Sequence, residues 1–67
     1  NSNIMEIGMF GDLDYAVETA IQIEECPAKR GLNDDISTEI ILIISEDAPL
    51  DRCTGLNIAD YVLVVKK

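Results

Sequence analysis

Residues 40–44 read IILII, five consecutive apolar side chains of which four are β-branched. Side chains of this kind favour strands, and an unbroken apolar run is typical of a strand that is covered on both faces. We therefore predict a strand over residues 36–46 and expect it to be the central strand of a sheet. A second run, YVLVV at residues 61–65, predicts the last strand, over residues 58–66.

The chain before this run predicts a strand followed by a helix. Residues 3–10 are mainly apolar, which suits a strand with one face better buried than the other. Asp12 is suited to cap a helix that Pro27 ends by about Cys26. Apolar residues recur at helical spacing on one face, which we expect to pack on the sheet. They are Leu13, Ala16, Val17, Ala20 and Ile21.

The two remaining segments are predicted to be connections. Residues 27–35 contain proline, glycine, asparagine and aspartate, which indicates a loop. Residues 47–57, with Pro49 and Gly55, predict a short helix or an irregular loop, long enough for a parallel crossover. The order strand, helix, strand, short crossover, strand predicts a small α/β or α+β fold with a three-stranded sheet and one main helix.

Length and composition predict one small folded domain over residues 1–67. The chain has 67 residues, of which 48% are hydrophobic and 27% charged. Two strongly apolar strands need cover on both faces of the sheet, whereas one helix covers a single face. We therefore expect a homodimer, or a partner protein, to cover the remaining face.

Charge and cysteine content exclude several classes of function. Thirteen acidic against five basic residues give a net charge of -8, which argues against nucleic-acid binding. Apolar runs of at most five residues are too short to span a membrane, and without a secretory signal pattern we expect a cytoplasmic protein. The chain has no histidine to complete a zinc site, and we expect no cofactor. Cys26 and Cys53 are expected to be free and mostly buried.

Acidic residues follow the first two predicted strands. Asp12 and Asp14 come after the first, and Glu46 and Asp47 after the second. In open α/β sheets ligands bind beyond the carboxyl ends of the strands, so these four residues predict a metal site. Such a site could support Mg²⁺-dependent phosphoryl transfer. Helix capping by Asp12 and ordinary surface charge explain the same residues without a metal and are the favoured interpretation.

The order of these residues resembles that of the haloacid-dehalogenase phosphatases. The resemblance rests on Asp12-Leu13-Asp14 after an apolar strand, Ser45 at the end of the next and a lysine near the third. It implies a nucleophilic first aspartate, two aspartates on Mg²⁺, and a serine and lysine that steady the phosphoryl group. The chain departs from the pattern at Gly11 and Tyr15, and it is too short for that family's sheet.

No catalytic constellation stands out from these patterns. We therefore expect a small acidic domain that acts by self-association or protein interaction, without catalytic activity of its own. The metal or phosphoryl-transfer site is the alternative function.

Overall fold

The computed structural model describes residues 4–66 and contains one α-helix, one 3-10 helix and four strands. Asn1–Asn3 and Lys67 lie outside the described residues. In chain order the elements are β1 (Ile4–Phe10), α1 (Leu13–Glu25), η1 (Pro27–Arg30), β2 (Ser37–Ile44), β3 (Leu50–Asp51) and β4 (Leu56–Lys66).

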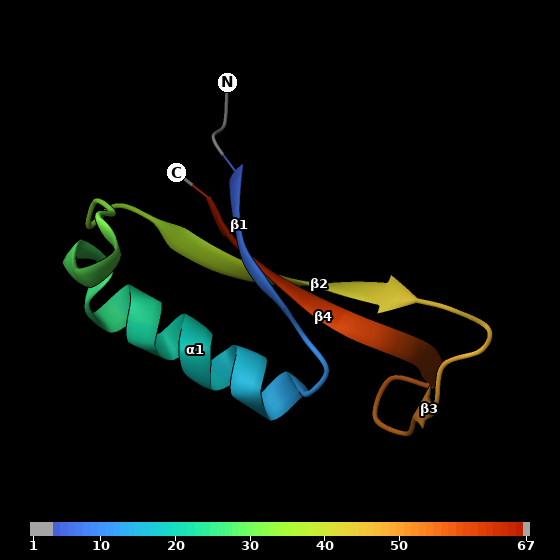
Figure 1. Ribbon diagram of the computed structural model, residues 1–67. Coiled ribbons are helices and arrows are strands. Elements are labelled where there is room, and N and C mark those ends of the chain that lie inside the picture. Colours follow the sequence, from blue (N-terminus) through green and yellow to red (C-terminus); the bar gives the residue numbers. More distant parts are fainter. Residues whose placement is uncertain (1–3, 67) are drawn as a thin grey trace.

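The sheet is antiparallel, and its strand order is β1-β4-β2 (Figure 1). Because β4 runs against both neighbours, β1 and β2 are parallel to each other on either side of it. Helix α1 lies between these two strands in the chain, so β1, α1 and β2 form a split β-α-β unit. The short β3 pairs with the beginning of β4 as a hairpin. The molecule therefore belongs to the α+β class.

Three predictions about the sheet were wrong. The sheet has four strands rather than the predicted three, because β3 pairs with β4. The central strand is β4, and β2, which contains IILII, lies at an edge. The last two strands are antiparallel, so there is no parallel crossover between them. The physical reason is the length of β4: its 11 residues pair with β1 on one side and β2 on the other.

The connection between β2 and β4 contains a hairpin. The predicted short helix or irregular loop at residues 47–57 is replaced by β3 and a tight turn that Gly55 closes with φ 75°. The Gly55 amide donates to the Asp51 carbonyl at 2.8 Å, and the Asn57 side-chain amide donates to the Ala48 carbonyl at 2.9 Å. A positive φ favours glycine, which is why the chain can reverse here.

The predicted limits of the helix are confirmed. The Asp14 amide donates to Oδ1 of Asp12 at 3.1 Å, so Asp12 is the N-cap, and Cys26 is the C-cap. The predicted loop that follows begins with η1, which ends at Gly31 in the left-handed conformation. Asparagine and aspartate residues then lead into β2.

The buried face of α1 differs in part from the predicted one. Ala16, Ala20 and Ile23 are buried, but the predicted core residues Leu13, Val17 and Ile21 are exposed. The small alanines let the helix approach the sheet closely, where it packs on side chains of β4. Those side chains are Ile58, Tyr61, Leu63 and Val65.

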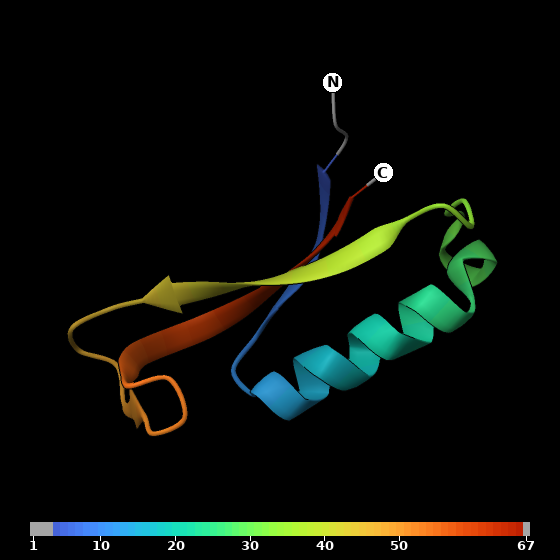
Figure 2. The same cartoon turned by 180° about the vertical axis from the view of Figure 1, so that it is seen from behind.

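Helix α1 lies on one side of the sheet only, as Figure 2 shows from behind. Among residues 4–66 no other α-helix covers the opposite side. We call this uncovered side the open face of the sheet.

Candidate functional site

The four acidic residues predicted as metal ligands lie in two separate turns. Asp12 uses its carboxylate to cap α1, and Asp14 lies exposed in the first turn of that helix. Glu46 and Asp47 lie in the turn after β2, where the Asp47 amide donates to the Ser45 hydroxyl at 3.4 Å. Both pairs follow strands that run in the same direction, but β4 separates those strands.

Within residues 4–66 no group of three or more aspartate, glutamate or cysteine side chains is placed to hold a metal ion. The capping role of Asp12 accounts for one of its oxygens without any metal. The antiparallel sheet also lacks the parallel crossover that was predicted between its last two strands. Metal binding by these acidic residues stays a prediction.

Tyr61 lies near acidic residues that the sequence patterns did not place beside it. Its side chain is buried against α1, and its pKa is raised above 10.0 by burial and by Asp51, Asp12 and Cys53. The hairpin places Asp51 near the tyrosine. This neighbour could have been predicted from the sequence only if the β3 turn had been recognised. The raised pKa extends the pH range over which the phenol stays protonated in the folded chain.

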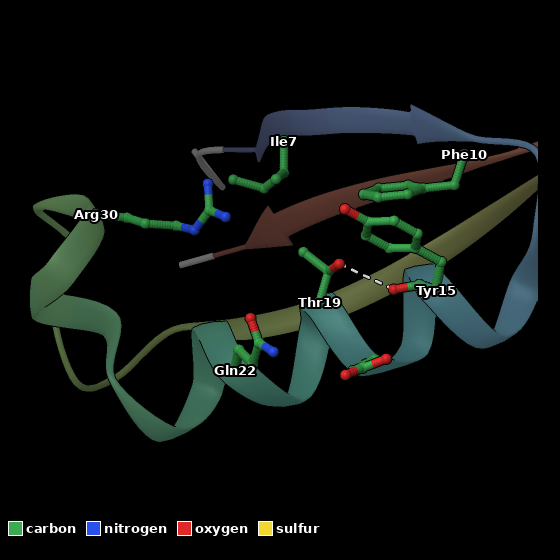
Figure 3. A pocket seen from close by; sticks show the side chains of 7 residues that line it. Ile7, Phe10, Tyr15, Thr19, Gln22 and Arg30 are labelled. Carbon is green, nitrogen blue, oxygen red and sulfur yellow. Dashed lines mark hydrogen bonds between the residues drawn. The ribbon is translucent and has the colours of Figure 1, made fainter.

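A groove of about 500 Å³ lies between β1 and α1 (Figure 3). The rings of Phe10 and Tyr15 pack there at 5.3 Å between centroids and a tilt of 44°. The Thr19 hydroxyl donates to the Tyr15 carbonyl at 2.9 Å. The groove is wide open and holds no pair of groups arranged as nucleophile and base. It is lined by Ile7, Phe10, Tyr15, Glu18, Thr19, Gln22 and Arg30.

The open face of the sheet carries apolar side chains that no other element of residues 4–66 covers. Val62 and Val64 of β4 form its centre, and the paired residues of the neighbouring strands surround them. Directly paired residues point to the same face, so the register assigns these side chains to the open face. Its exposed apolar residues are Ile4, Met9, Ile41 and Ile43, at 58, 60, 42 and 39% exposure.

Charged residues lie at the two ends of the open face. Lys66 pairs with Ser37 and Ile4 in the register and forms an ion pair with Glu39. At the other end of β4, Asp60 pairs with Ile43. Glu6 and Glu39 lie on either side of Val64, as its register partners. The face is therefore apolar around Val62, acidic around Val64 with Lys66 next to it, and acidic again at Asp60.

The cysteines were predicted only in part. Cys26 and Cys53 are free, as predicted, but both are exposed, so the prediction that they are buried was wrong. Each lies at a chain reversal, one after α1 and one in the β3 turn, where little else packs. Across residues 4–66, no helix has the length and apolar character needed to cross a membrane.

Comparison with known proteins adds no relative: no family model, no curated protein and no solved structure matches this chain.

Proposed function

We propose that this domain is a non-catalytic interaction module that self-associates through the open face of its sheet. The observation that supports it is the group of three exposed apolar residues, Met9, Ile41 and Ile43, around Val62, with Ile4 exposed on the same face at the Lys66 end. Monomers rarely leave contiguous apolar patches larger than a few hundred Å² in water. Burial of such a face stabilises a complex by about 25 cal/mol for each Å² of apolar surface removed from water.

Charge complementarity supports a second copy as the occupant of this face. The open face has Lys66, which also pairs with Glu39, at one end of β4 and Asp60 at the other. Two copies stacked face to face with their strands antiparallel bring each Lys66 opposite the partner's Asp60. A twofold arrangement uses every contact twice, which makes such an interface self-complementary.

Sedimentation equilibrium at several concentrations tests this proposal. We expect a dimer whose dissociation shifts with concentration, and we expect Ile41→Asp to raise its dissociation constant more than about tenfold. The effect is large because the twofold axis places two new carboxylates in one apolar interface. The matched control is Ile44→Asp, since Ile44 is 58% exposed on the same strand but pairs with Ile58, which packs against α1 on the other side of the sheet.

A stable monomer of 7.4 kDa throughout the micromolar range, without aggregation, contradicts the proposal. Equal weakening by Ile41→Asp and Ile44→Asp also contradicts it, because the contact would then not be specific to the open face. Charge reversal at both ends, Lys66→Asp and Glu39→Lys with Asp60→Lys, preserves both the Lys66–Glu39 pairing and the complementarity and should retain the dimer.

A further inference from the structure

The outer edge of β2 is free. Within residues 4–66, no strand pairs with β2 on the side away from β4. Edge strands are commonly protected from pairing by charged residues, prolines or bulges. The eight residues of β2 contain no proline and only one charge, that of Glu39, which Lys66 neutralises. The register shift lies at its last step, between Ile43 and Ile44. Most of this edge can therefore accept another strand.

An apolar stripe of α1 lies on the side of this edge. The stripe, Leu13, Val17 and Ile21, is 40, 40 and 52% exposed. Glu24 continues it by one helical turn and accepts a hydrogen bond from the Thr38 hydroxyl of β2.

The contacts on the opposite flank of the helix show to which side of the sheet the stripe points. Tyr15 lies on that flank and contacts Phe10 of β1. The middle of the helix packs on β4 through Ala16, Ala20 and Ile23. The stripe therefore projects beyond β2, over the space that a further strand would occupy.

We propose that the β2 edge and the apolar stripe of α1 bind an extended peptide segment of a partner protein. The segment would add to the sheet as a strand, with apolar side chains at alternate positions and lysine or arginine at both ends. Every second side chain of an added strand points to the helix side, where the stripe can cover it. This surface differs from the open face, so the inference does not depend on the proposed dimer.

The charges at the two ends of β2 favour a basic segment over a second copy. Asp34 and Asp35 precede the strand, Glu46 and Asp47 follow it, and all four are exposed. Antiparallel pairing of two β2 edges would set one acidic end against the other. A segment with basic ends meets opposite charge in either direction, and the net charge of -8 attracts it from a distance.

The test uses a labelled synthetic peptide and fluorescence anisotropy. Its core alternates valine and threonine over eight residues, the length of β2, with two lysines at each end. We expect saturable binding by the full chain that weakens as salt increases. A peptide with glutamates at its ends, and one with a proline in the core, should each bind at least about tenfold more weakly.

Variants of the protein separate the stripe from the rest of the helix. Ile21→Ser should weaken peptide binding about tenfold, since it removes apolar surface from the contact. Tyr15→Ser on the opposite flank is the matched control and should change binding less than about twofold. Replacing Asp34, Asp35, Glu46 and Asp47 together by lysine should reverse the preference, so that the glutamate-ended peptide binds better. Circular dichroism checks that each variant is folded.

Three results would overturn the inference. Undiminished binding of the proline peptide would mean that charge alone attracts it. Unchanged binding by Ile21→Ser would exclude the stripe. The third result concerns a dimer formed without peptide. If Ile21→Ser dissociates this dimer and Ile41→Asp does not, the β2 edge binds a second copy of the chain. Loss of the dimer in Ile41→Asp with peptide binding intact would leave both proposals standing, because the side chain of Ile41 points to the open face.

Discussion

The two five-residue apolar runs look alike in sequence and occupy different places in the fold. All five side chains of residues 61–65 are buried in the central strand β4. In residues 40–44, at the edge of the sheet, Ile41, Ile43 and Ile44 are exposed and none of the five is fully buried. The difference shows that apolar content selects a strand but does not decide its neighbours.

Hydrogen-bonded neighbours explain the different burial. Val62 and Val64 point to the open face, yet they are only 7 and 4% exposed. Strands on both sides of β4 shield them, since Met9 and Ile41 are the register partners of Val62. Ile41 has such a neighbour on one side only. One missing strand therefore separates a buried valine from an exposed isoleucine on the same face.

The largest expected effect comes from a charge placed in each run. Val64→Asp should prevent folding, because its carboxylate would be buried beside Glu6 and Glu39, its register partners. Ile41→Asp should leave a folded chain, because Ile41 is 42% exposed. Far-ultraviolet circular dichroism and thermal melting compare the two variants. A folded Val64→Asp chain would contradict the central position of β4.

Truncation of the side chains should show the same difference on a smaller scale. Leu63→Ala should lower the free energy of unfolding by about 2–5 kcal/mol, since Leu63 is fully buried under α1. Ile44→Ala, in a residue that is 58% exposed, should cost less than about 1 kcal/mol. Urea denaturation measures both, and equal losses would mean that β2 is as well covered as β4.

Local signals allowed much of the fold to be predicted. The N-cap at Asp12, the end of the helix at Cys26 and the positions of the three longer strands follow from residues close in sequence. Strand order depends on contacts between distant residues, which the apolar patterns do not encode. The β3 hairpin depends on a glycine turn and on two hydrogen bonds. The residues that form them are equally compatible, in sequence, with a short helix or a loop.

The candidate sites were less predictable for the same reason. The expectation of an uncovered sheet could be made from apolar content, but the residues on the open face depend on register. The apolar stripe of α1 was assigned to the core, because spacing alone does not show which part of an apolar face meets the sheet. Asp51 lies near Tyr61 only because the chain reverses at Gly55.

A smaller effect on stability is expected from the N-cap of α1, which lies near Tyr61 of β4. Asp12→Ala removes the side-chain acceptor for the Asp14 amide and should lower the free energy of unfolding by about 1 kcal/mol. Asp12→Asn is the matched control, because asparagine caps helices about as well. Equal destabilisation by both variants would contradict the capping role and point to the charge of Asp12 instead.

The smallest expected effect is a pH dependence that comes from Tyr61 in β4. Its pKa in the folded chain is raised above 10.0, first by burial and then by the nearby Asp51 and Asp12 carboxylates. The folded state therefore keeps the proton at a pH where the unfolded chain releases it. The resulting stabilisation is fully present below a pH of about 10 and is lost as the pH rises through the folded pKa.

Urea denaturation across this range, in the parent chain and in Tyr61→Phe, measures the contribution. Stability should fall less steeply with rising pH in Tyr61→Phe, because phenylalanine has no proton to lose. The matched control is Tyr15→Phe, since Tyr15 is 63% exposed at the other side of the helix. If stability falls equally steeply with rising pH in the parent chain and in Tyr61→Phe, the phenol lies in a solvated environment. In that case β4 is less well covered at Tyr61 than at Leu63.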